Sequence, residues 1–207
     1  MHSPKSLFFL FILIFFITKT LFAEMTVREL IFDNSKPMQL KILETLPEEA
    51  IVQIGNKNAE NTIIEFMDYF CGYCKKIHPE LIELAKERDD VRVVFLQHPI
   101  LNQSSYLIAK MVIAANLQKK GFDLHHNIFS IKGSITQEKL IEAINDSGLN
   151  EVLLQIDMQK PEVEKIIQLS SFLAGGVGAR GTPSIFVNEI FSPQYLSKAQ
   201  IIGMLKK

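Results

Sequence analysis

The sequence predicts an α/β fold with a helical subdomain inserted into it, and three observations carry this prediction. A β-forming apolar run at 62–67 predicts a buried strand, residues 71–87 carry helical spacing, and residues 91–96 are continuously apolar like a central parallel strand. From 104 to 179 the pattern is almost wholly helical, and a loop and strand follow at 180–188. The strand–helix–strand order implies a right-handed crossover between two parallel strands.

Shorter patterns predict the remaining elements. A further strand is expected at 50–55, and a helix from about Ser197 follows a hairpin strand near Ile190. Inside the helical segment, the predicted helices cover residues 106–119, 121–129, 136–147, 149–156 and 161–174. The turn at 188–190 lacks the glycine that is usual in such hairpins, which leaves its turn type open.

Composition limits the classes of protein that the chain can represent. With 207 residues, 47% of them apolar, the chain is long enough for one domain with a sizeable core. Its net charge is −1, which gives no sign of nucleic-acid binding. We therefore expect one globular domain that has no nucleic-acid partner.

Residues 1–23 are predicted to be a secretory signal peptide. Lys5 precedes an unbroken apolar run at 7–17, and these eleven residues are too few to span a bilayer, which needs about 20. Ala23 is the expected last residue removed. Because Leu21 is larger than the small residue usual at its position, an uncleaved N-terminal anchor is the alternative. We expect export to the periplasm or the cell surface.

Residues 24–49 precede anything that the predicted sheet requires, and they form an N-terminal extension to a domain at 50–207. Two short amphipathic stretches carry the apolar residues Val27, Leu30, Ile31, Met38, Ile42, Leu43 and Leu46. Helix-stop and helix-start signals separate the two stretches. These helices either pack back on the domain or mediate association between subunits, because an apolar stripe outside the core serves either purpose.

The chain contains only two cysteines, and they lie three positions apart in Cys71-Gly72-Tyr73-Cys74. A cysteine at the first turn of a helix faces unpaired backbone N–H groups and the positive end of the helix dipole, and both favour the thiolate that attacks disulfides. We predict Cys71 as the nucleophile and Cys74 as the shielded resolving thiol, with Gly72 allowing tight backbone passage. A structural use of cysteine in an exported domain usually needs more of them, so the pair indicates redox chemistry.

Two acidic residues near the pair are candidates for supporting roles. Glu65 interrupts the apolar strand, and Glu is almost never fully buried without a reason. We expect Glu65 beneath the helix start near Cys74, where desolvation raises its pKa and suits it to take and return the Cys74 proton. A partly exposed strand face is the alternative. Asp68 is expected to cap the turn before Cys71 through backbone N–H groups.

The residues from Glu65 through Cys71 and Cys74 to Pro79 resemble the active-site strand and kinked helix of the thioredoxin fold. The stretch at 66–75 is more narrowly similar to the DsbA-like exported thiol–disulfide oxidoreductases, especially the branch with the ScsC and Com1 proteins. The resemblance extends from about Ile51 to the C-terminus. It implies a thioredoxin fold with an inserted helical subdomain and a helical N-terminal extension. Some ScsC-like relatives trimerise through such an extension, so the resemblance favours a homotrimer.

The same resemblance assigns Thr182 and Pro183 to a cis-proline loop that faces the cysteines and pairs with an extended substrate. Relatives that isomerise disulfides often have threonine before this proline, which favours an isomerase. Tyr73 replaces the histidine found between the cysteines of the strongest oxidases. Because a neutral tyrosine cannot stabilise the Cys71 thiolate as a cationic histidine does, the sequence predicts a less oxidising pair.

We therefore expect a disulfide isomerase that acts on unfolded or misfolded exported proteins, with a membrane redox partner that recycles the cysteine pair. The alternatives are a monomeric dithiol oxidase, a non-catalytic docking protein and a copper-binding module, in which the two cysteines and His78 or His98 bind a soft ion. His125 and His126 are expected at the surface or in packing. The prediction includes no metal and no cofactor.

Overall fold

The computed structural model describes residues 35–207, and the chain divides into two units, residues 1–45 and 46–207. In the first unit, helix α2 covers Met38–Thr45, and a salt bridge of 2.8 Å joins Lys36 to Glu44. The predicted signal peptide and the first part of the extension lie outside the described residues. Among the helices of residues 35–207, none is both long and apolar enough to cross a membrane.

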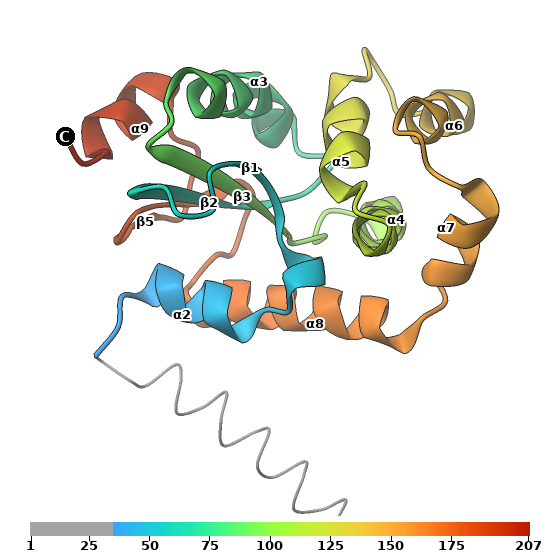
Figure 1. The fold of residues 1–207 in the computed structure, drawn as a ribbon, viewed down its shortest axis with the longest axis horizontal. Coiled ribbons are helices and arrows are strands. Elements are labelled where there is room, and N and C mark those ends of the chain that lie inside the picture. The colour runs from blue at the N-terminus through green and yellow to red at the C-terminus, as the bar shows by residue number, and fades with distance from the viewer. Residues whose placement is uncertain (1–34) are drawn as a thin grey trace, which may run out of the picture. The chain divides into compact units, whose positions relative to one another are not determined.

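A five-stranded mixed sheet forms the centre of the second unit (Figure 1). Its strands are β1 (Val52–Gly55), β2 (Asn61–Met67), β3 (Val91–Gln97), β4 (Ser184–Val187) and β5 (Ile190–Ser192), in the order β1-β3-β2-β4-β5. Strands β2 and β3 are parallel, whereas every other neighbouring pair is antiparallel. The predicted parallel pair is confirmed, and it lies at the centre of the sheet.

Helices cover both faces of this sheet. Helix α3 (Gly72–Glu87) connects β2 to β3 and lies on the same face as α9 (Lys198–Met204), while α8 (Pro161–Gly176) covers the opposite face (Figure 1). The two central strands are consequently buried on both sides. Of the seven residues of β2, all but Thr62 are buried, which explains the continuous apolar run.

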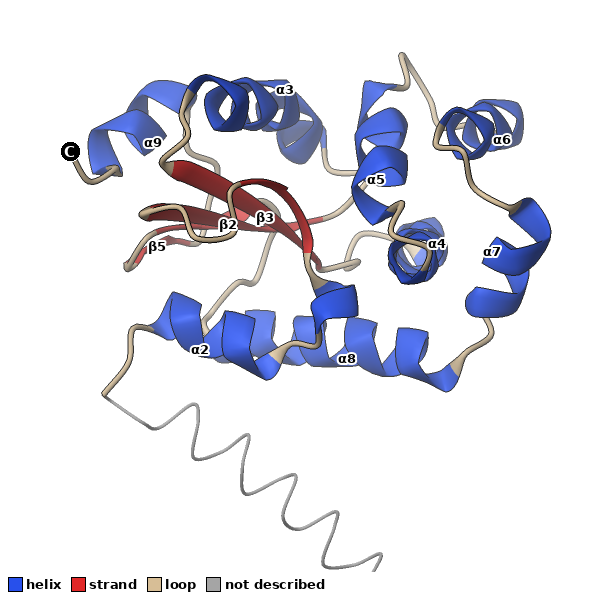
Figure 2. Cartoon of the chain, in the orientation of Figure 1, coloured by secondary structure: helices blue, strands red, loops and turns tan. Residues whose placement is uncertain are grey.

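Five helices stand between β3 and β4, which confirms the predicted helical insertion (Figure 2). They are α4 (Gln103–Leu117), α5 (Gly121–Ser130), α6 (Gln137–Asp146), α7 (Glu151–Asp157) and α8. Helix α4 begins three residues before its predicted start because the Asn102 side chain accepts a hydrogen bond from Ser105 N. The strand expected from residue 50 begins at Val52, since Glu48–Ala50 form the 3₁₀ helix η1.

The β4–β5 hairpin shows how the chain turns without glycine. Asn188 has a positive φ of 53°, and asparagine tolerates this left-handed conformation better than most residues. Its side chain accepts a hydrogen bond of 2.9 Å from Thr62 N and donates one of 2.8 Å to Asn61 Oδ1. The turn residue therefore also extends the contact between β4 and β2.

Asn188→Ala is expected to lower the free energy of unfolding by about 2 kcal/mol, because alanine is strained at positive φ and removes both hydrogen bonds. Asn188→Gly adopts the same φ without strain and should cost about 1 kcal/mol. Urea denaturation of both variants measures the difference. Equal losses of unfolding free energy in the two variants would show that strain at positive φ contributes nothing to the effect of Asn188→Ala.

Candidate functional site

The predicted site residues meet at the end of the sheet where β2 finishes and β4 begins. Strand β2 ends at Met67 and leads into α3, while the antiparallel strand β4 begins beside it, directly after Pro183. The Thr182–Pro183 peptide bond is cis. Cys71 Sγ donates a hydrogen bond of 3.0 Å to the carbonyl oxygen of Thr182, so the loop faces the first cysteine. We call Cys71, Cys74, Thr182 and Pro183 the cysteine site.

Cys71 is the N-cap residue of α3. Its sulfur accepts a hydrogen bond of 3.4 Å from Cys74 N, which occupies one of the unpaired donors of the first helical turn. The turn that delivers Cys71 is closed by Asp68, whose carbonyl oxygen accepts a 3.0 Å bond from Cys71 N. The Asp68 carboxylate also accepts a bond of 2.8 Å from Phe70 N, so the predicted cap is confirmed.

The electrostatic surroundings of Cys71 favour its thiolate. Hydrogen bonding from the Cys74 thiol is the main cause, followed by the Thr182 side chain and the backbone N–H groups of Cys74 and Tyr73. Burial acts in the opposite direction, but the pKa of Cys71 still falls to about 5. With 8% of its surface exposed, Cys71 is ionised at neutral pH and narrowly accessible.

Cys74 and Glu65 lie in the interior behind Cys71. Cys74 is fully buried, and this desolvation, together with its hydrogen bond to Cys71 and the charge of Glu65, raises its pKa. Glu65 lies on the central strand β2 and is 1% exposed. Burial raises the pKa of Glu65 to about 8, with a smaller opposing effect from hydrogen bonding to Cys74. A carboxyl with this pKa can exchange a proton with a thiol near neutral pH.

Residues 47–207 match the model of the thioredoxin family. Among solved structures, a thioredoxin-like oxidoreductase from Silicibacter pomeroyi DSS-3 is 30% identical, with a TM-score of 0.70, over 76% of this chain and 91% of that one. The chain belongs to the thioredoxin family. No curated protein matches the sequence.

Two further solved structures share the fold of this thioredoxin-family chain. The catalytic domain of Proteus mirabilis ScsC is 20% identical over 88% of this chain and 94% of that one, with a TM-score of 0.68. The thiol-disulfide exchange protein α-DsbA2 from Wolbachia pipientis is 23% identical over 87% and 91%, also with a TM-score of 0.68. The predicted similarity to the DsbA-like and ScsC-like branch is confirmed. Together, family and fold support a thiol–disulfide oxidoreductase.

The two residues between the cysteines are open to solvent. A Cβ atom at Gly72 would meet no described atom within 4 Å outside its chain neighbours and its own helix, so no other segment crowds this position. Tyr73 is 59% exposed, and its ring centroid lies 5.3 Å from that of Tyr195 in the segment before α9. Lys76 Nζ lies 5.1 Å from the Tyr195 ring centroid. Sequence reasoning missed Tyr195, because it stands 122 positions beyond Tyr73.

His78, His125 and His126 form a cluster, in which His78 and His125 are buried. His78 Nε2 lies 3.0 Å from His126 Nδ1, and Tyr69 Oη lies 2.9 Å from Nδ1 of the fully buried His125. Burial lowers the pKa of His78 to about 3. His98 lies elsewhere, with Nε2 3.1 Å from the carbonyl oxygen of Ala179. Within residues 35–207, no three His, Cys, Asp or Glu side chains are grouped as metal ligands.

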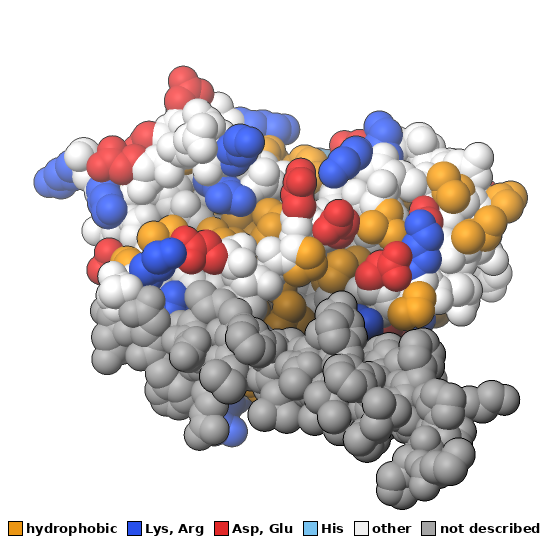
Figure 3. Space-filling model, turned by 60° about the horizontal axis from the view of Figure 1, so that its bottom comes forward, with side chains coloured by type: hydrophobic (Ala, Val, Ile, Leu, Met, Phe, Trp, Pro, Cys, Tyr) orange, Lys and Arg blue, Asp and Glu red, His pale blue; other side chains and the backbone are white. Residues whose placement is uncertain are grey.

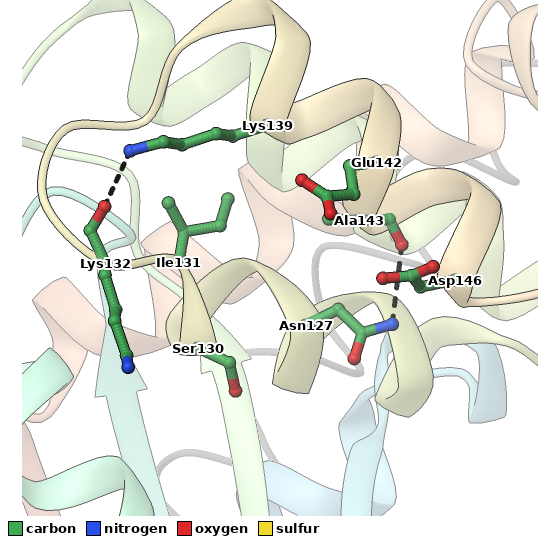
Figure 4. A pocket seen from close by; sticks show the side chains of 8 residues that line it. All are labelled: Asn127, Ser130, Ile131, Lys132, Lys139, Glu142, Ala143 and Asp146. Carbon is green, nitrogen blue, oxygen red and sulfur yellow. Dashed lines mark hydrogen bonds between the residues drawn. The ribbon is translucent and has the colours of Figure 1, made fainter.

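Other surface features lie on the insertion. A pocket of about 410 Å³ between α5 and α6 is lined by Asn127, Ser130, Ile131, Lys132, Lys139, Glu142, Ala143 and Asp146 (Figure 4). It contains none of the predicted site residues. Apolar side chains also gather at the right-hand end in Figure 3, where α7 exposes Val152, Leu153 and Ile156. The cysteine site is distinct from both features.

The reduced protein is expected to show a thiolate titration with a midpoint at about pH 5, followed by absorbance at 240 nm. Cys71→Ser should abolish it. Cys74→Ala should move the midpoint upward, because the Cys74 thiol supplies the largest stabilisation of the Cys71 thiolate. A wild-type midpoint near 9, the ordinary value for cysteine, would contradict this account of the site.

Glu65→Gln is expected to stabilise the protein at neutral pH. The Glu65 pKa is raised to about 8 by folding, from an ordinary value of 4.5. Between these values folding takes up a proton, so the free energy of unfolding falls as pH rises, by at most about 1.4 kcal/mol per pH unit. The variant lacks this proton uptake and should gain up to about 3 kcal/mol at pH 7.

The measurement is urea denaturation of the disulfide form between pH 5 and 7.5, where Cys71 does not titrate. Replacing the exposed Glu60 by glutamine serves as the matched control and should leave the pH slope unchanged. If Glu65→Gln keeps the wild-type slope, Glu65 does not titrate in this interval.

Proposed function

We propose that this chain is an exported protein disulfide isomerase that acts through Cys71 and Cys74. One observation carries the proposal: a narrowly accessible sulfur with a lowered pKa caps a helix and faces the cis-proline loop. Such a sulfur is the nucleophile that thiol–disulfide exchange requires. The family, and the relative described as a thiol-disulfide exchange protein, support the same reaction class.

In isomerisation, the Cys71 thiolate attacks one sulfur of a non-native substrate disulfide. The S–S bond breaks, the other substrate sulfur leaves as a thiolate, and a mixed disulfide joins Cys71 to the substrate. Another substrate thiolate then attacks the mixed disulfide and releases the Cys71 thiolate, so no net oxidation occurs. When the intermediate stalls, Cys74 transfers its proton to Glu65, attacks Cys71 Sγ and frees the substrate as a thiolate, leaving the Cys71–Cys74 disulfide.

Thr182 is proposed to bind the substrate through its backbone. An extended segment that pairs with the cis-proline loop brings its own sulfur toward Cys71, as strand addition does in other peptide-binding sites. The Thr182 side chain helps to lower the pKa of Cys71. A sulfur with a lower pKa leaves a mixed disulfide more readily, so Thr182 helps to set how fast Cys71 is released from the substrate.

A dithiol oxidase is the second candidate, and the lowered pKa of Cys71 favours it. Stabilising the thiolate stabilises the reduced pair, which makes the Cys71–Cys74 disulfide a better oxidant. In this reaction the disulfide passes to a substrate dithiol, and the two substrate thiols leave their protons and electrons on Cys71 and Cys74. A redox partner must then reoxidise the pair, whereas an isomerase needs a partner that keeps it reduced.

The proposal includes export, assembly and partners. Cleavage after Ala23 would release the mature chain into the periplasm, and residues 24–49 would join three copies. Three linked sites could hold one misfolded client at several points, which raises the effective concentration of each reaction. The partner that sets the redox state would be a membrane protein.

Reactivation of a scrambled, fully oxidised multi-disulfide protein distinguishes the candidates. We expect the mature chain, reduced beforehand, to restore activity, Cys71→Ser to abolish this effect, and deletion of residues 24–45 to reduce it at least about fivefold. The deletion leaves the second unit and η1 intact. Oxidation of a dithiol peptide without reactivation would make the chain an oxidase instead.

A further inference from the structure

We propose that Asp68 is a positioning residue for thiol–disulfide exchange, because its carboxylate fixes the turn that carries Cys71 to the loop that follows β3. The inference rests on the proposed function. Within residues 35–207, the hydrogen bonds of the Asp68 carboxylate go to Phe70, Ile100, Leu101 and Ser105 and not to the reacting sulfurs. It acts through the backbone geometry that aims Cys71.

Four donors converge on this one carboxylate. Oδ1 accepts hydrogen bonds from Phe70 N at 2.8 Å and Ser105 Oγ at 2.7 Å. Oδ2 accepts bonds from Ile100 N at 2.9 Å and Leu101 N at 3.0 Å. Asp68 is 1% exposed, so water cannot replace these partners. Loss of the acceptor would leave three backbone N–H groups and one hydroxyl without their partner.

The donors come from two parts of the chain that are far apart in the sequence. Phe70 directly precedes Cys71, Ile100 and Leu101 lie in the loop after β3, and Ser105 lies in the first turn of α4. The main-chain carbonyl of Asp68 also accepts the bond from Cys71 N. Asp68 therefore links the backbone around the nucleophile Cys71 to the start of the helical insertion.

This arrangement determines where the Cys71 sulfur points. The 3.0 Å bond that the Cys71 thiol donates to the Thr182 carbonyl is lost when the sulfur ionises. The thiolate is stabilised by donors that must stay within reach of it, among them Cys74 N at 3.4 Å. Hydrogen bonds are steeply sensitive to distance and angle, so a turn released by a missing carboxylate would weaken them. The thiolate would then lose stabilisation even though every residue that contacts it is unchanged.

The charge of Asp68 has the opposite effect, which makes the proposal testable. A nearby negative charge disfavours a thiolate, so removal of the charge alone would lower the pKa of Cys71. Loss of positioning would raise it. Burial lowers the pKa of His98, and the hydrogen bond to Ala179 and the charge of Asp68 partly oppose this effect, so a further fall in the His98 pKa reports that the charge has been removed.

The experiment uses the full mature chain, reduced, with Asp68→Asn. The amide keeps the shape of the side chain but presents N–H groups to donors. We expect the Cys71 midpoint, followed at 240 nm, to rise by at least half a pH unit, about a threefold loss of thiolate at acidic pH. The His98 pKa, followed by NMR, should fall. A Cys71 midpoint that is unchanged or lower would overturn the proposal.

Two more variants keep the test decisive. Asp90→Asn removes a carboxylate that pairs with Arg88, and it should leave the Cys71 midpoint unchanged. Ser105→Ala removes one of the four donors and should raise the midpoint in the same direction by a smaller amount. If Asp68→Asn fails to fold, Ser105→Ala decides, and an unchanged midpoint overturns the proposal. Absence of exchange activity in the wild type would refute the proposed function without altering these titrations.

Discussion

The cap of α3 by a sulfur atom is the interaction on which the rest of the site depends. Ser, Thr, Asp or Asn normally accepts the first helical N–H groups, and here Cys71 takes that place. A thiolate accepts such bonds far better than a thiol, so the helix and the ionised sulfur stabilise one another. Placing the helix directly after the central strand also brings the buried Glu65 and Cys74 behind the nucleophile, where water cannot reach them.

Local signals predicted much of this arrangement. The apolar run at 62–67, the carboxylate within it and the cysteine pair all lie within residues 62–74, and each carries its own chemical reason. The cis-proline loop came from resemblance, since nothing in residues 180–183 alone distinguishes it from an ordinary strand start. The burial of Glu65 agrees with the first of its two interpretations.

The sequence did not predict the contacts between residues that are far apart in the chain. Asp68 has partners 32 to 37 positions away, and neither Ile100 nor Ser105 carries a pattern that indicates this contact. The packing of His78 against the insertion has the same origin, because two helices must be folded before their side chains meet. At Gly72 the sequence alone does not show whether another segment approaches the backbone, and in the structure none does. Glycine is compatible with both arrangements, so only the folded chain distinguishes them.

The near-complete burial of Cys71 has a consequence for the choice of clients. In disulfide exchange the attacking sulfur approaches along the axis of the bond that breaks, so three sulfur atoms must become nearly collinear. A recessed sulfur can meet this requirement only when the other chain bends inward and exposes its disulfide. Rigid native proteins resist that bending, whereas loosely folded chains accept it easily. In the proposed exchange reaction, the recess would therefore select clients by their mobility and spare correctly formed disulfides without any recognition of sequence.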